Sequence, residues 1–166
     1  MLNGRIEQEN KLKGKINEKL TQLPSVFTEF YNYMEADNKS YLTCLHYISY
    51  VADFMNFVTK GATNGEFYKD VTVPEIRSYI TSLRRRTDGN GETKNGDSIQ
   101  ATRWSALNTF YNFLVMDDYV DLNLMTKTKR PKNRTEKPIV YLEKEEIEDI
   151  GYNNYIKLVR FFYGKD

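Results

Sequence analysis

The sequence has little of several residue types, and each scarcity excludes a class of protein. Its single cysteine, Cys44, rules out an internal disulfide framework and fits a reducing cytoplasm. One cysteine and one histidine, His46, are too few for a structural zinc site. The apolar runs are only a few residues long, so no segment spans a bilayer, and the charged N-terminus lacks the apolar core of a secretory signal. We therefore expect a cytoplasmic protein with no metal, no cofactor, no membrane partner and no small-molecule substrate.

What is present is ordinary in amount but uneven in distribution. Apolar residues make up 40% of the 166 residues and charged residues 28%, which is typical of one soluble domain with flanking segments. Behind the net charge of +1, residues 76–137 hold twelve Lys and Arg against seven Asp and Glu, while residues 31–75 hold three against six. A basic block beside acidic flanks suits local contact with a polyanion. An unevenly charged, solvated surface explains the same pattern.

Helical spacing of apolar residues, with start and stop signals, predicts four helices between residues 24 and 122. No segment shows the sustained alternation of a strand, so the expected class is all-α, a four-helix bundle. The predicted starts are Pro24 with Ser25, a Ser40 cap, a capping box of Thr72 with Glu75, and a cap at Asp97 or Ser98. The predicted ends are residues 36–39, Lys60 before Gly61, the cluster Arg84, Arg85 and Arg86, and about Met116.

The flanks of this bundle read differently. Residues 1–23 are interpreted as a weakly ordered lead-in helix, because apolar residues are sparse there and Gly4 and Gly14 weaken a helix. Residues 123–138 hold six Lys and Arg and two Pro with almost no core-forming residues, so they are interpreted as a basic linker. Residues 139–166 begin a second unit, with a helix opening at Leu142 and an acidic first turn.

Two of the predicted helices have outer faces that are polar but uncharged. In the fourth helix, Trp104, Leu107, Tyr111 and Leu114 mark the buried side, and the opposite side carries Ala101, Thr102, Ser105, Asn108, Thr109 and Asn112. The second helix carries Thr43, His46, Ser49, Tyr50 and Asn56 away from its apolar stripe, with Asp53 as the one charge. Helices that face only water usually carry Lys and Glu there. Small neutral side chains permit close approach to a DNA groove or to another helix, and both hypotheses stay open.

The order of several motifs resembles the core-binding domain of tyrosine recombinases, the phage-integrase family. The second helix carries the run of residues 43–47, and the fourth has Thr102 with Arg103 and then residues 105–107. Asn123 stands where the family usually has Asn-Pro, Pro131 with Lys132 matches its linker, and Leu142 with residues 145–147 is similar to the opening of its catalytic domain.

The resemblance implies a SAM-like helical domain that grips one side of a recombination half-site within a C-shaped clamp. It implies that the second and fourth helices enter the major groove, and to this we add Lys94 and the two basic clusters as expected phosphate contacts. The expected partners are double-stranded DNA at a recombination core site and other recombinase protomers, in a mobile genetic element. The expected DNA-binding residues are Thr43, His46, Arg84, Arg85, Arg86, Lys94, Thr102, Arg103, Lys129, Arg130 and Lys132.

The sequence departs from the family in its chemistry. The family cleaves DNA with a tyrosine nucleophile, activated by arginines, a lysine and histidines in the catalytic domain. A segment like residues 160–164 is followed in the family by the first catalytic arginine, and here the chain ends at Asp166. His46 also lacks an arginine three positions later, where Ser49 stands. We therefore expect an amino-terminal fragment with no catalytic residues, which is not an enzyme by itself. The alternative is a helical protein–protein interaction module that uses the neutral faces.

Overall fold

The computed structural model describes residues 2–85 and 96–132. These residues belong to the first of the two units into which the chain divides, residues 1–135 and 136–166. Throughout the described ranges every regular element is helical, which confirms the expected all-α class. The elements are α1 (Leu2–Thr21), α2 (Ser25–Ala36), α3 (Tyr41–Thr59), α4 (Val73–Arg84) and α5 (Gly96–Met116), with 3-10 turns η1 (Phe67–Lys69) and η2 (Leu124–Lys127).

Local sequence signals place the starts of α3 and α4. The Thr43 N–H donates to Ser40 Oγ at 3.2 Å, so Ser40 is the N-cap of α3. The Thr72 N–H donates to a Glu75 carboxylate oxygen at 2.7 Å, and the Glu75 N–H donates back to Thr72 Oγ1 at 3.4 Å. These two backbone N–H groups, which have no partner within the helix, are thereby satisfied. The predicted capping box is confirmed.

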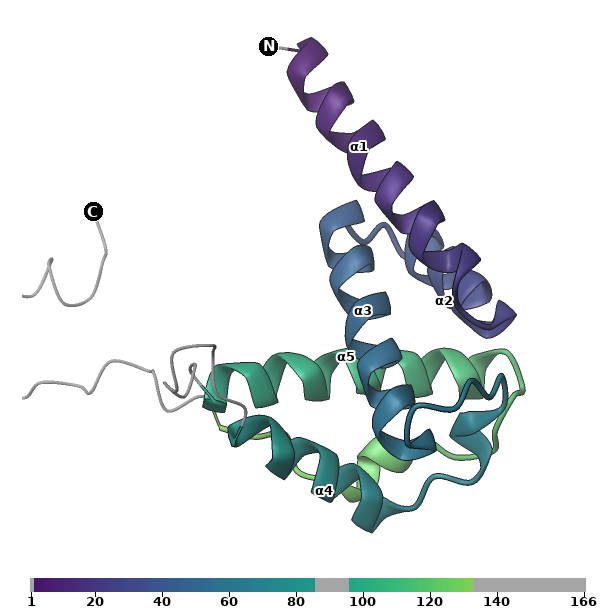
Figure 1. Cartoon of the computed structure of the whole chain (residues 1–166), viewed down its shortest axis with the longest axis vertical. Coiled ribbons are helices and arrows are strands. Elements are labelled where there is room, and N and C mark those ends of the chain that lie inside the picture. The colour runs from purple at the N-terminus through teal and green to yellow at the C-terminus, as the bar shows by residue number, and fades with distance from the viewer. Residues whose placement is uncertain (1, 86–95, 133–166) are drawn as a thin grey trace, which may run out of the picture. The chain divides into compact units, whose positions relative to one another are not determined.

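Helix α5 lies at the centre of the bundle and packs against α2, α3 and α4 (Figure 1). Its Phe110 is the hub of an aromatic core. The Phe110 ring stacks on Phe67 with centroids 5.8 Å apart and meets Phe30 edge-on at 5.1 Å. Such pairs add to the stabilisation that burial of aromatic area gives. Phe67 comes from η1, between the helix end predicted at Lys60 and the helix start predicted at Thr72, so part of this connection belongs to the core.

Helix α1 is docked through its second half. The Ile16 side chain is fully buried, and α1 packs against α3 and α2. The Lys13 ammonium also lies 4.8 Å from the centre of the Tyr41 ring. The first turns extend beyond these contacts, as Figure 1 shows, and leave Leu2 80% exposed. The fully buried Ile16 and the partly buried Leu20 therefore hold a long helix whose first turns are exposed.

Two expectations about α5 are wrong. The helix begins at Gly96, so Asp97 and Ser98 lie within its first turn and neither is the N-cap. Ala101, assigned to the outer face, is only 4% exposed. The chain covers this part of α5 from two sides, because the Gln100 amide donates to the Ile80 carbonyl at 2.8 Å and Arg130 Nε donates to Ser105 Oγ at 3.3 Å.

The segment after α5 is packed for its first few residues. Met125 in η2 is fully buried, and η2 packs against both α4 and α5. The expectation that this stretch holds almost no core-forming residue therefore misses Met125. Arg86, Lys94, residues 133–138 of the basic linker and the helix expected to open at Leu142 lie outside the described residues.

Candidate nucleic-acid interface

A ridge of hydroxyl side chains runs along the solvent side of α5. Thr102 is exposed, and Ser105 and Thr109 are partly exposed. Each hydroxyl donates to the carbonyl four residues earlier, at 2.9 Å for Thr102 and 3.0 Å for the other two. Since the O–H of each hydroxyl donates within the helix, each oxygen acts toward other groups as an acceptor, as Ser105 Oγ does toward Arg130 Nε at 3.3 Å. The side chains of the ridge are thus short, uncharged acceptors of hydrogen bonds, which suits the close approach of a polar surface.

A column of stacked groups joins this ridge to the outer face of α3. The His46 ring stacks on the Tyr50 ring with centroids 5.9 Å apart. The Arg103 guanidinium carbon lies 4.0 Å from the centre of the same Tyr50 ring, a cation–π contact. The column therefore joins two predicted DNA-binding residues, His46 on α3 and Arg103 on α5. A third, Thr102, precedes Arg103 on α5. Thr43, one turn before His46, accepts a hydrogen bond from the Ser40 hydroxyl at 2.9 Å.

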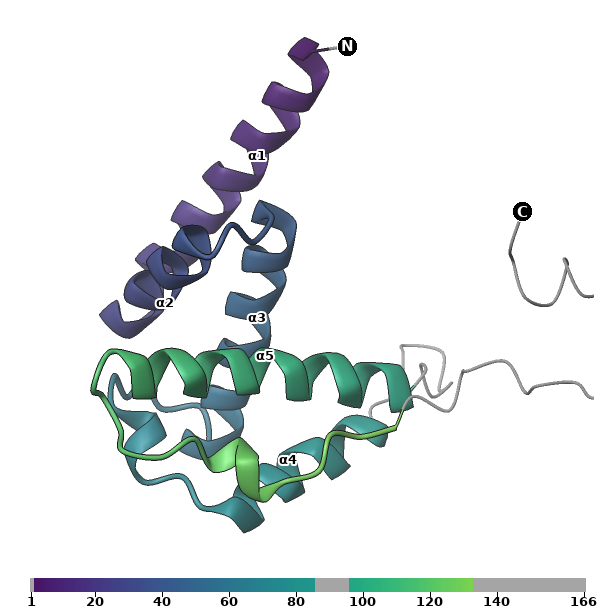
Figure 2. The same ribbon diagram turned by 180° about the vertical axis from the view of Figure 1, so that it is seen from behind.

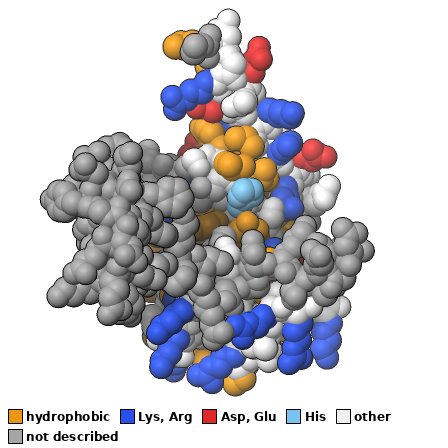
Figure 3. All heavy atoms as spheres, turned by 90° about the vertical axis from the view of Figure 1, so that its left-hand side faces the viewer, with side chains coloured by type: hydrophobic (Ala, Val, Ile, Leu, Met, Phe, Trp, Pro, Cys, Tyr) orange, Lys and Arg blue, Asp and Glu red, His pale blue; other side chains and the backbone are white. Residues whose placement is uncertain are grey.

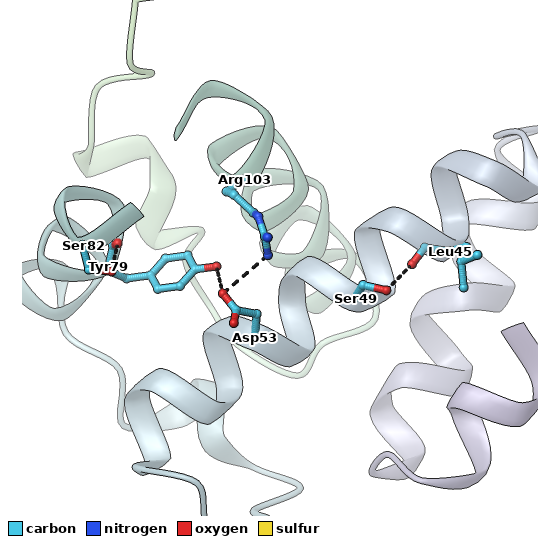
Figure 4. Close-up of polar contacts among 6 residues, drawn as sticks. All are labelled: Leu45, Ser49, Asp53, Tyr79, Ser82 and Arg103. Atoms are coloured by element: carbon cyan, nitrogen blue, oxygen red, sulfur yellow. Dashed lines mark hydrogen bonds and ion pairs between the residues drawn. The ribbon is translucent and has the colours of Figure 1, made fainter. Parts of the chain in front are cut away.

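Arg103 is also bound to an acidic group that the sequence prediction left out of the site. Its Nη1 lies 3.4 Å from an Asp53 carboxylate oxygen, and the Tyr79 hydroxyl donates to that same oxygen at 2.8 Å. Figure 4 shows the three side chains converging from α5, α3 and α4. The Arg103 side chain is 20% exposed, so it is held in place rather than extended into solvent. The one sequence signal for this arrangement is the lone charge of Asp53 on the outer face of α3.

The other border of the α5 ridge is formed by the chain returning along the helix. Asn123 Nδ2 donates to Oδ1 of Asn112 at 2.7 Å and of Asn108 at 3.0 Å. The Trp104 indole N–H donates to Thr128 Oγ1 at 2.8 Å. Figure 2 shows the segment beside α4 and α5, on the other side of α5 from α3. Asn108 and Asn112 therefore hold Asn123, although the sequence pattern placed them on a free outer face.

The segment that returns along α5, residues 123–130, carries basic side chains that lie in two different places. Arg130, through its 3.3 Å contact with Ser105, reaches the hydroxyl ridge. Lys127 and Lys129 instead line a groove of about 430 Å³ together with Arg77 of α4. The structure thus separates Lys129 from Arg130, which the sequence had grouped in one linker cluster, and adds Arg77, which the sequence prediction missed.

The remaining predicted cations lie at the end of α4 and beyond η2. Arg84 and Arg85 are exposed, and Arg85 lines a second hollow of about 420 Å³ that also includes Arg77. Lys132 is exposed as well. Figure 3 shows Lys and Arg side chains gathered along the lower edge of the face that carries the histidine. Among the predicted cations, Arg130 is joined to the neutral ridge by a hydrogen bond to Ser105.

The described residues offer little for other chemistry. Among them no group of three or more His, Cys, Asp or Glu side chains is arranged to hold a metal ion. Cys44 is buried, and burial raises the pKa of its thiol, which lowers its reactivity. In the same part of the chain, no helix combines the length and apolar character needed to cross a bilayer.

Comparison with known proteins gives one consistent result. Over 138 residues the chain is 29% identical to tyrosine recombinase XerC of Bacillus licheniformis. The aligned region covers 80% of this chain and 42% of that protein. Over 127 residues it is 26% identical to tyrosine recombinase XerC of Listeria welshimeri, which covers 76% of this chain and 39% of that protein. The chain is similar to tyrosine recombinases. No family model and no solved structure matches it.

This similarity supports a recombinase-related role. The chain spans about two fifths of the length of these curated tyrosine recombinases.

Proposed function

We propose that the helical unit is the core-binding, SAM-like module of a site-specific tyrosine recombinase of a mobile genetic element. It grips one face of a recombination half-site, with α3 and α5 in the major groove of double-stranded DNA. The observation that carries the proposal is the uncharged ridge of α5, joined to α3 through the column of His46, Tyr50 and Arg103. The similarity to tyrosine recombinases supports it independently.

The ridge and column are suited to base readout. Thr102, with Thr43 and His46 on α3, would face base edges, where short hydrogen-bonding side chains approach closely. Arg103 presents a planar fork of N–H donors that fits the O6 and N7 acceptors of guanine. These residues belong to two helices that contact each other in the described unit, so one groove can receive both.

The flanking cations are proposed as phosphate contacts, which fix register without reading sequence. Arg130 borders the ridge directly. The others in this proposal are Arg84, Arg85, Lys129 and Lys132, together with Arg86 and Lys94 outside the described residues. Because each phosphate contact releases counterions, duplex affinity should fall steeply as salt rises.

Two further parts of the proposal concern partners and chemistry. Other recombinase protomers would bind adjacent half-sites on the same DNA. The 166 residues would bind DNA without cutting it, since His46 has no arginine three positions later. Incubation of the chain with supercoiled plasmid should therefore give no covalent protein–DNA adduct, and any adduct would refute this part.

The binding proposal is tested by selection from a random duplex library of roughly 30 base pairs, about three helical turns, at low and moderate salt. One enriched motif, with affinity that weakens as salt rises, is the expected result. The variant Thr102→Glu places a negative charge on the ridge and should abolish enrichment. Thr28→Glu is the matched control, because Thr28 is an exposed threonine on α2.

Equal enrichment by both variants would show that the ridge does not face DNA. Self-association or partner binding that survives high salt, and that Thr102→Glu alone disrupts, would instead support the protein–protein module. Neutralising Arg84 and Arg85 together should weaken binding to all duplexes by similar factors, because phosphate contacts carry no sequence information. Undiminished binding would place the duplex elsewhere on the unit.

A further inference from the structure

Asp53 is an unexpected residue to find beside a surface proposed to meet DNA. Its side chain is 32% exposed, and it is the only acidic residue in α3. A carboxylate there repels the phosphate backbone, so it lowers the affinity for any duplex, whatever the sequence. Its contacts show what this charge does within the unit.

The Asp53 carboxylate fixes Arg103 from one side while Tyr50 fixes it from another. The ion pair measures 3.4 Å, and the guanidinium carbon lies 4.0 Å from the centre of the Tyr50 ring. The Tyr79 hydroxyl, donating at 2.8 Å, orients the same carboxylate oxygen from α4. An arginine side chain loses much rotamer freedom when it is held this way, and that loss is then not incurred on binding.

Only part of the donor capacity of Arg103 is used in this arrangement. The guanidinium has five N–H donors in a fixed fork, and within the described residues Nη1 alone makes a hydrogen bond, to Asp53. The other donors make no hydrogen bond within these residues, so a base edge that met them would leave the ion pair intact. A phosphate that approached Arg103 would instead compete with Asp53 for the same charge.

We propose that Asp53 is a specificity-determining positioning residue, which holds Arg103 for base readout and disfavours its use as a phosphate contact. The inference rests on the proposed DNA-binding function. It predicts that removal of the Asp53 charge raises the affinity for unselected DNA while the preference for the selected sequence falls.

The test compares Asp53→Asn with the wild-type chain by fluorescence anisotropy on two duplexes. One is the duplex enriched in the selection, and the other has the same base composition in scrambled order. For Asp53→Asn the ratio of the two affinities should fall on the order of tenfold, the discrimination of one good arginine–guanine pair. Asp121→Asn removes the same charge at an exposed site after α5 and should leave the ratio unchanged.

Two further variants separate positioning from folding. Tyr79→Phe keeps the carboxylate and removes one hydrogen bond to it, so the ratio should fall less, by about threefold. Arg103→Lys keeps the charge and removes the fork, so it should lower the ratio in the wild-type background but not further in Asp53→Asn. Far-UV circular dichroism verifies that each variant is helical.

The outcomes are distinct. If the wild-type chain prefers one duplex and a folded Asp53→Asn keeps that ratio, the inference fails while the proposed function stands. If Asp53→Asn does not fold, an unchanged ratio in a folded Tyr79→Phe overturns the inference in the same way. If the wild-type chain shows no preference for any duplex, the proposed function fails and the inference fails with it.

Discussion

The substitution Asn123→Ala should destabilise the helical unit more than its position after the last long helix suggests. Asn123 is 8% exposed, and its side chain makes three hydrogen bonds. Nδ2 donates to Asn112 at 2.7 Å and to Asn108 at 3.0 Å, while Oδ1 accepts from the Met125 N–H at 2.8 Å. This one amide therefore joins α5 to the start of η2.

The magnitude follows from what each partner does after the amide is removed. The Met125 residue is buried, so its N–H is left without an acceptor, which costs roughly 1–3 kcal/mol. Asn112 is exposed and Asn108 partly exposed, so water replaces those bonds and their loss costs about 0.5 kcal/mol each, the low end of the range. The expected loss in the free energy of unfolding is therefore about 2–4 kcal/mol.

Urea denaturation followed by circular dichroism measures this loss, with the midpoint falling and the slope unchanged. The matched control is Asn123→Asp. It keeps the acceptor for Met125 N–H, and the amides of Asn108 and Asn112 can turn to donate to it, so the loss should be smaller. If the free energy of unfolding of Asn123→Ala lies within about 0.5 kcal/mol of the wild-type value, the amide of Asn123 does not anchor η2.

Three other results are expected. Tyr111→Phe should leave stability equal or raise it by about 1 kcal/mol, since the buried Tyr111 hydroxyl has no hydrogen-bond partner among the described residues; a loss above that size contradicts this. Burial, with nearby Glu35, raises the pKa of Tyr31 to about 12, and burial raises the pKa of Tyr111 too. The folded chain therefore keeps these two protons to a higher pH than the unfolded chain does. The free energy of unfolding that they contribute below pH 10 should decline from there toward pH 12. Tyr31→Phe should reduce that decline in alkaline urea titrations. Thr72→Ala should cost about 1 kcal/mol in the same assay, whereas Thr63→Ala, in the exposed loop before it, should cost little.

Features governed by neighbours in sequence were predictable. The Ser40 cap and the Thr72 capping box depend on contacts over three residues, so residue type and spacing suffice to find them. The end of α3 near Gly61 follows from the same kind of signal, with Lys60 and Gly61 both at positive φ. The core stripe of α3 was also visible, because one helix repeats its faces at a fixed period.

The surface of α5 was only partly predictable, because periodicity tells which residues share a face but not what covers that face. Ala101 and Asn108 share the polar side with Thr102 in a helical projection, yet Ala101 is buried and Asn108 binds Asn123. The packing of α4 and of residues 123–130 against α5 decides this, and no local pattern in α5 encodes it. The stacking of Arg103 on Tyr50 depends likewise on how α3 crosses α5.

By itself, the sequence determined the helical class, the starts of α3 and α4, and the resemblance to recombinases, since these depend on residue type, spacing and order along the chain. Tertiary structure alone decided that Asp53 and Tyr79 hold Arg103, that Asn123 anchors the returning segment, and that Lys129 and Arg130 point to different places. The physical reason is one of range. Caps and periodicity act within a turn or two of helix, whereas these contacts join side chains that lie many residues apart and meet only when the helices pack.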